Sequence, residues 1–172
     1  LLEVEEGQDV LDLCCAPGMK LALLARQAAE VSVTGVDISA PRLAAARAIA
    51  KRYRLPRARL FLADGTSCTI PRHVLLPRES RVSPIPNFAF WSSSVYRKSP
   101  GVLADALYDR VLVDAQCTHD GSIRHLRKLP LDSPEWSQFE VSHLEALYEL
   151  QLNLLRNGWR HLKPGGILIY ST

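Results

Sequence analysis

The chain has few of the cysteine patterns that define metal-binding and disulfide-stabilised proteins. Its four cysteines, Cys14, Cys15, Cys68 and Cys117, form neither a C-x-x-C pair nor a Cys/His run with zinc spacing, so we expect no metal site. Taken singly, each is best interpreted as a small buried apolar residue. Their scarcity fits a reducing intracellular compartment, and nothing distinguishes cytoplasm, nucleus and mitochondrion.

Long apolar runs are also missing, and we do not expect the first residues, Leu-Leu-Glu-Val-Glu-Glu, to be a signal peptide. No run reaches the length of a membrane-spanning helix, so we expect no membrane association. The 172 residues, 47% of them hydrophobic, suffice for one globular domain, and they contain no internal repeat. The first residue is not methionine and both ends adjoin predicted strands. We therefore expect a fragment of a fold that is truncated at both ends. We also expect a monomer.

Alternating apolar runs and helical patterns predict an α/β fold. The predicted strands are 10–15, 31–38, 59–63, 110–113 and 167–170. The predicted helices are 21–29, 42–53 and 140–162. Ser39 is a predicted N-cap with Pro41 just inside the helix, and Lys163-Pro164-Gly165-Gly166 is predicted to end the last helix. Five such alternations indicate a doubly wound, mostly parallel sheet with helices on both faces.

One segment does not follow this alternation. Residues 66–101 contain five prolines and a serine run, with no periodicity, so we expect an irregular insertion in a domain spanning 1–172. Phe88, Phe90, Trp91 and Tyr96 indicate that it packs against the domain and is not a simple linker.

Four acidic residues stand where predicted strands end, namely Asp12, Asp37, Asp64 and Asp114. Any single one could be a helix cap, but four at successive strand ends describe a pocket for an adenosine-containing ligand. Pro17-Gly18 turns the first strand sharply into a helix, and we expect its glycine to let the backbone approach the ligand. Asp37, nineteen residues after Gly18, is placed to accept hydrogen bonds from ribose hydroxyls.

Two nucleotide-binding patterns are absent from the first turn. Gly18 is its only glycine, which argues against the G-x-G-x-x-G of NAD-binding folds, and no G-x-x-x-x-G-K-[ST] phosphate loop is present. What remains is a Rossmann-like S-adenosylmethionine-dependent methyltransferase fold. In that fold the first turn passes the methionine end of the cofactor, Asp37 holds the ribose and Asp64 faces the adenine.

The motifs resemble those of the Nop/Sun (Fmu-like) RNA (cytosine-5)-methyltransferases over nearly all of the chain except 66–101. Asp12-Leu13-Cys14-Cys15-Ala16-Pro17-Gly18-Met19-Lys20 is similar to D-x-C-A-A-P-G-G-K, and Asp114-Ala115-Gln116-Cys117-Thr118 is similar to D-A-P-C-[ST]. Val36-Asp37-Ile38-Ser39 and Ala63-Asp64-Gly65 match the two motifs between them. Leu147 to Leu155 with Gln151, then Leu162 to Gly166 and Tyr170-Ser171-Thr172, resemble L-x-x-x-Q, L-K-P-G-G and Y-S-T-C-S.

The resemblance implies formation of 5-methylcytosine in tRNA or rRNA. A thiolate adds to C6 of cytosine and makes C5 nucleophilic, an acid near N3 (Asp114) stabilises the ring, and Lys20 helps keep thiolate available. By motif, Cys117 assists release of the methylated RNA. The cofactor residues implied are Asp12, Cys14, Ala16, Pro17, Gly18, Lys20, Asp37, Asp64 and Asp114.

Two features leave alternatives open. In this family the attacking cysteine follows Y-S-T, and the chain stops at Thr172, so we expect the nucleophile to be missing; Cys117 as nucleophile is a minor alternative. Gln116 stands where proline is usual, which removes a fixed φ and allows an impaired relative that only binds RNA or cofactor. A methyltransferase for another acceptor is a third alternative, but it leaves Cys117 and the basic residues unexplained.

Basic residues gather in two places. Residues 41–60 contain seven and no acid, which fits either phosphate binding or a solvated helix face. A second group, Arg124, Arg127 and Lys128, follows Cys117 closely, and we expect it to contact the RNA strand whose target base is flipped into the pocket.

Overall fold

The computed structural model describes residues 2–55, 57–70, 89–92, 107–118, 122–127, 130 and 132–172. The strands are β1 (Asp9–Asp12), β2 (Ser32–Asp37), β3 (Ala58–Leu62), β4 (Ala89–Ser92), β5 (Tyr108–Asp114) and β6 (Leu162–Ser171). The helices are α1 (Met19–Leu24), α2 (Ala40–Arg52), α4 (Ile123–Leu126), the 3-10 helix η2 (Pro134–Phe139) and α5 (Val141–Arg160). None of the helices in these ranges is long and apolar enough to cross a lipid bilayer.

The six strands form one sheet in the order β4-β3-β2-β1-β5-β6, and every neighbouring pair is parallel. β1 lies inside the sheet, where Val10 pairs with Val33 of β2 on one side and Leu11 pairs with Val111 of β5 on the other. The chain winds outward from β1 in both directions. The predicted doubly wound sheet is confirmed, and its strand order reverses between β1 and β5, where open α/β sheets bind ligands.

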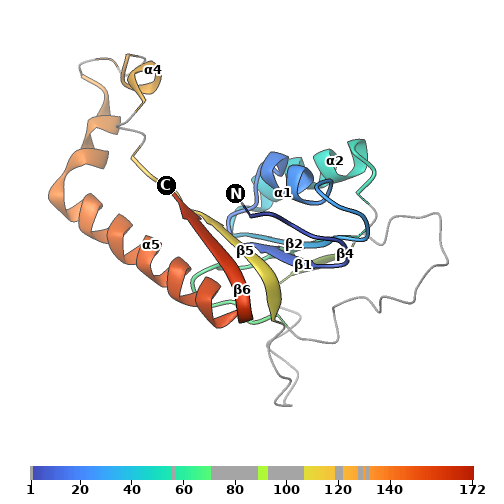
Figure 1. The fold of residues 1–172 in the computed structure, drawn as a ribbon. Helices are drawn as coiled ribbons and strands as arrows, with labels where there is room; N and C mark the ends of the chain where they lie inside the picture. The colour runs from blue at the N-terminus through green and yellow to red at the C-terminus, as the bar shows by residue number, and fades with distance from the viewer. Residues whose placement is uncertain are drawn as a thin grey trace.

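Alternate residues of the strands supply two cores, one on each face of the sheet. Val10 packs with Leu21 of α1 and Leu43 of α2, whereas Leu11 packs in a second cluster with Leu154 of α5. Figure 1 shows α1 and α2 together on one face and α5 across the other. Since strand side chains alternate between faces, nearly continuous apolar strands are what this three-layer arrangement requires.

The helix starts follow local chemistry that the sequence contains. Ser39 is the N-cap of α2, with its hydroxyl 3.5 Å from the Arg42 N–H, and Pro41 occupies the first turn as predicted. Helix α1 is shorter than the predicted 21–29. The Arg26 and Gln27 N–H groups bond to Leu23 and Leu24, an i to i−3 pattern that tightens and ends the helix.

The structure corrects two sequence predictions. Strand β4 forms inside the segment expected to be irregular, pairing Phe90 with Leu60 of β3. Four residues are too few to show a period of two, so the segment's composition masked the strand. Lys163 to Gly166 do not form a separate turn after α5: α5 ends at Arg160, and these residues are already part of β6, with an irregular register beside Tyr108 and Arg110.

Candidate active site

The carboxyl ends of the central strands surround a cavity of about 560 Å³, a volume typical of small-ligand sites. Asp37, Asp64 and Asp114 line it from β2, the β3 end and β5. The other lining residues are Leu13, Cys14, Ala16, Ile38, Arg42, Gly65, Ala115, Gln116, Cys117, Leu150 and Leu154. The cavity therefore combines acidic groups with apolar walls from both faces of the sheet.

Asp12, the fourth acid, ends β1 and is 1% exposed, so it lies beneath the cavity rather than on its wall. Its Oδ1 accepts a hydrogen bond of 3.2 Å from the Cys14 N–H. Burial is the main cause that raises the pKa of Asp12 to about 7; the charges of Asp114 and Asp37 act in the same direction, and the Cys14 hydrogen bond and Lys20 act against it. The carboxyl group is thus poised to take up or release a proton near neutral pH.

Gly18 forms the predicted sharp turn after β1. Packing against α2 requires that this residue be a glycine. Its φ is 105°, and a Cβ built there would lie 2.8 Å from Cα of Ala46 on α2. Gly18 does not line the cavity, and neither do Pro17 and Lys20. The glycine allows α1 to start against α2, and this close approach of two helices is a packing reason in addition to the ligand approach that was predicted.

Asp37 is held by the backbone around it and is 4% exposed. Its Oδ2 accepts from the Ala16 N–H at 3.2 Å and its Oδ1 from the Ser39 N–H at 2.9 Å. Arg42 donates to the Ala16 carbonyl at 2.8 Å and lies 3.9 Å from Asp37 Oδ2. The two turns after β1 and β2 are therefore joined through one carboxylate.

Asp64 is exposed and closes a short turn, because its Oδ1 accepts from both the N–H and the hydroxyl of Thr66, at 2.9 and 2.7 Å. The same loop is held from α5 by Asn157, which is 2% exposed and donates to the carbonyls of Gly65 and Cys68. Asn157 was missed from the sequence, since a lone asparagine inside a helix gives no signal of a contact 92 residues away.

Asp114 gathers side chains from two other elements. Its Oδ1 lies 2.5 Å from Nζ of Lys20 at the start of α1 and accepts a hydrogen bond from the Ser171 hydroxyl of β6. Cys117 lies three residues further on, half-buried at the cavity wall. Of the predicted catalytic residues, Asp114 and Cys117 both line the cavity, and Lys20 contacts Asp114 without lining it.

Cys14 lines the cavity, but its thiol is a poor nucleophile. Burial, together with the negative charges of Asp12, Asp37 and Asp114, raises the pKa of Cys14 to about 12. The thiol is therefore neutral at physiological pH. Cys15 is 3% exposed and packs on β2, where a Cβ at Gly35 would meet its sulfur at 2.7 Å.

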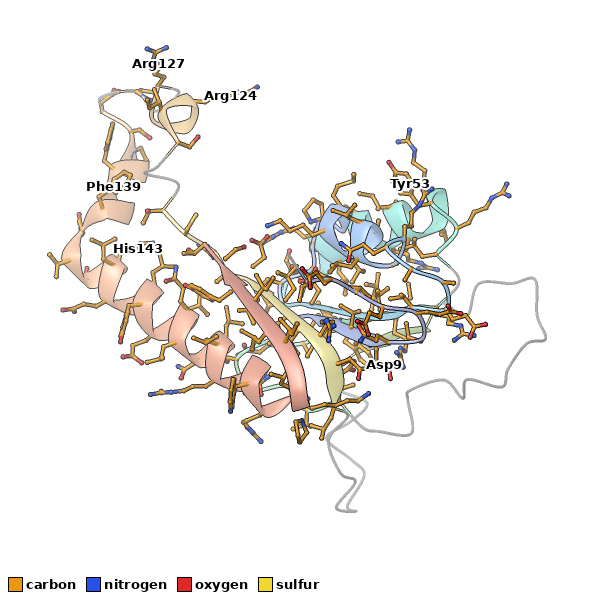
Figure 2. All side chains as sticks on the ribbon, viewed as in Figure 1. Asp9, Tyr53, Arg124, Arg127, Phe139 and His143 are labelled. Carbon is orange, nitrogen blue, oxygen red and sulfur yellow. The ribbon has the colours of Figure 1, made fainter. Side chains whose placement is uncertain are left out.

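The predicted RNA-binding arginines lie outside the cavity. Arg124 on α4 and Arg127 just after it are exposed, and Figure 2 shows both at the tip of a segment that projects away from the sheet. Lys128 lies outside the described residues. Ile38 and Arg42 were not predicted as cavity residues, although both stand within five residues of Asp37.

Two protein-family models match different parts of the chain. Residues 88–172 match the family described as 16S rRNA methyltransferase RsmB/F, and residues 10–74 match a general methyltransferase domain. The first match contains β4, β5, α5 and β6, and the second contains the strand ends at Asp12, Asp37 and Asp64.

Individual relatives give the same result. The chain is 30% identical over 172 residues to ribosomal RNA small subunit methyltransferase B of Enterobacter sp. (strain 638), covering 99% of this chain and 31% of that protein. It is 31% identical to the 5-cytosine rRNA methyltransferase NSUN4 of Xenopus laevis, covering 99% and 35%. The chain thus spans about a third of the length of the curated relatives it matches.

Solved structures with the same fold come from Pyrococcus horikoshii. NSun6, crystallised with SFG, superposes with a TM-score of 0.62 at 20% identity, over 98% of this chain and 33% of that one. A methyltransferase homologue from the same organism gives 0.61 at 23% identity, over 98% and 40%. At these identities the likeness shows a shared Rossmann-like methyltransferase fold.

Proposed function

Because the chain belongs to the Nop/Sun (Fmu-like) family of RNA (cytosine-5)-methyltransferases, we propose that it is the cofactor-binding core of an enzyme that makes 5-methylcytosine in ribosomal or transfer RNA. One observation carries the proposal. Acids stand at the carboxyl ends of four adjacent parallel strands, and three of them, Asp37, Asp64 and Asp114, line a cavity that also has Cys117 on its wall. A purely structural role for these residues leaves that convergence unexplained.

The donor set of the cavity fits S-adenosylmethionine, which supplies an electrophilic methyl group when bound. Each oxygen of Asp37 accepts one backbone N–H, and a carboxylate oxygen has a second acceptor site that a ribose hydroxyl can use. Asp64 uses Oδ1 for Thr66, which leaves Oδ2 for the adenine amine. Ile38, 71% exposed at the cavity, offers an apolar surface for the adenine ring.

The other end of the cavity suits the acceptor base. Asp114 binds the N3 edge of cytosine, where charge develops on the ring, and Lys20 balances its charge from the opposite side. Cys117 contacts the base and assists release of the product, the role that its motif implies. Arg124, Arg127 and Lys128 hold RNA phosphates beyond the cavity.

The test uses the intact protein and an RNA containing 5-fluorocytidine. A cytosine-5 methyltransferase forms a stable covalent adduct with this RNA only in the presence of S-adenosylmethionine, and unmodified RNA gains 5-methylcytidine by nucleoside mass spectrometry. Asp37→Asn should abolish both signals by preventing cofactor binding. If the protein binds RNA but forms neither the adduct nor 5-methylcytidine, the proposed methyltransferase activity is wrong. That result would favour a relative that only binds RNA.

A further inference from the structure

The loop that carries Cys117 is held by β6 only as far as residue 115. The Ser171 hydroxyl donates to Asp114, and the Ala115 N–H donates to the Ser171 carbonyl at 2.9 Å. From Gln116 onward the chain has left the sheet, and Gln116 itself is exposed. The position of Gln116, the residue before Cys117, therefore depends on contacts other than pairing with β6.

Gln151 supplies that contact from α5. Its carboxamide Nε2 donates to the Gln116 carbonyl at 2.8 Å and also lies 3.1 Å from the Thr172 hydroxyl, just after β6. The neighbouring residue Leu150 and the next turn's Leu154 line the cavity, so this stretch of α5 faces the site. One side chain thus joins the loop after β5 to the end of β6.

Because residue 116 is a glutamine and not a proline, the hydrogen bond from Gln151 has a larger part in fixing the conformation of this loop. A proline there would fix φ, but Gln116 leaves φ free. Within the described part of the chain the Gln116 N–H donates no hydrogen bond, so the restraint on this residue comes through its carbonyl. The Gln151 contact therefore does by hydrogen bonding part of what a proline ring does covalently.

We propose that Gln151 is a positioning residue for Cys117, whose amide clamps the Gln116 carbonyl to the end of β6 and so presents the thiol to the base. The proposal rests on the proposed function for the reaction that the thiol serves. It predicts that Gln151 acts on the acceptor end of the cavity and not on cofactor binding, because Asp37 and Asp64 are held by their own turns.

Gln151→Met in the intact protein removes the donor and keeps the side-chain length. We expect kcat for RNA methylation to fall at least tenfold, while the Kd for S-adenosylhomocysteine stays within twofold. Asn153→Met is the matched control, since Asn153 lies two residues further along α5 and, within the described part of the chain, its side chain bonds to Arg156 alone, at 3.4 Å. The control should leave both quantities unchanged.

A double variant separates positioning from a general structural role. Gln116→Pro fixes φ and keeps the carbonyl, and among the described residues it removes no hydrogen bond of the Gln116 N–H. Gln116→Pro combined with Gln151→Met should recover kcat at least threefold over Gln151→Met alone. A role for Gln151 in general stability predicts no such recovery.

Alkylation of Cys117 by iodoacetamide, followed by peptide mass spectrometry, provides a readout that does not depend on methylation. We expect the rate to change at least threefold in Gln151→Met and to stay the same in Asn153→Met. Unchanged alkylation and kcat in Gln151→Met, or a parallel loss of S-adenosylhomocysteine affinity, would overturn the proposal. Absence of methylation by the unmodified protein would instead reject the proposed function, and alkylation alone would then decide the role of Gln151.

Discussion

The two ends of the cavity are held in different ways. At the end formed by β1, β2 and β3, the acids bind backbone N–H groups of nearby turns: Asp12 with Cys14, Asp37 with Ser39, and Asp64 with Thr66. At the end formed by β5 and β6, the partners come from distant elements, and Lys20 and Ser171 converge on Asp114. The first end is organised mainly by turns close in sequence, with added contacts from Ala16 to Asp37 and from Asn157 to the loop after Asp64, whereas the charged group at the second end is bound, in the described part of the chain, by side chains of distant elements.

This difference has a consequence for function. A turn that satisfies its own carboxylate keeps its geometry before any ligand arrives, which favours tight binding of a small cofactor. A site assembled from α1, α5, β5 and β6 is sensitive to shifts of each of these elements. Substitutions at the two ends should therefore separate cofactor affinity from the rate of reaction on RNA.

The largest effect is expected for Asp37→Ala. It leaves the N–H groups of Ala16 and Ser39 without acceptors and removes the proposed ribose ligand. We expect at least a 100-fold loss of S-adenosylhomocysteine affinity by calorimetry and a free energy of unfolding lower by about 2–4 kcal/mol. Asp132→Ala, at an exposed position, is the control. Unchanged affinity would show that this end of the cavity does not bind the cofactor.

Asp12 should make stability depend on pH. Its pKa is about 7 in the folded chain, whereas an exposed carboxyl group has a pKa of 3.8, so the folded state holds more protons than the unfolded state between these values. The contribution of Asp12 is full below pH 4 and is lost as pH rises toward 7, by an amount on the order of 4 kcal/mol. Denaturant unfolding from pH 4 to 8 measures it. Asp12→Asn should flatten the curve relative to the unmodified chain, and superimposable curves would contradict the assignment.

Gly18→Ala tests the turn at the local end. The added Cβ meets the Ala46 backbone in a conformation with φ of 105°, and we expect a loss of about 3 kcal/mol in the free energy of unfolding. Gly7→Ala is matched, because Gly7 also has a positive φ, 73°, but nothing lies within 4 Å of a Cβ built there. Its cost should be about 1 kcal/mol. Equal losses in the two variants would show that the contact with α2 is unimportant.

Asp114→Asn should have the smallest effect on binding and should act on the reaction. The amide oxygen can still accept from Ser171, but the charge that pairs with Lys20 is removed. We expect kcat for RNA methylation to drop at least tenfold and S-adenosylhomocysteine affinity to change less than fivefold. A larger change in affinity than in kcat would remove the functional distinction between the two ends.

Much of this site was predictable because its signals are local. Apolar runs marked five of the six strands, and Ser39 with Pro41 marked the start of α2. The acids could be placed at one edge because the carboxyl ends of parallel strands meet there. Gly18 was predicted at the right place for an incomplete reason, since its contact with Ala46 depends on how two helices pack.

The contacts missed from the sequence all cross long stretches of chain. Asn157 reaches Gly65, Gln151 reaches Gln116, and each asparagine or glutamine alone fits a solvated helix face equally well. The position of Arg124 and Arg127 on a projecting segment was likewise not implied by their closeness to Cys117 in sequence. Spacing along a chain does not give distance once a loop leaves the sheet.

The sequence by itself determined the order of strands and helices, the acids at the strand ends and the family, because periodicity, turn residues and motifs act over a few residues. The tertiary structure alone decided which side chains share the cavity with Asp114 and Cys117, how Gln151 bridges two strand ends, and why Asp12 has a raised pKa. Those properties depend on burial and on distances between elements, and both arise only when the sheet and its two helical layers pack together.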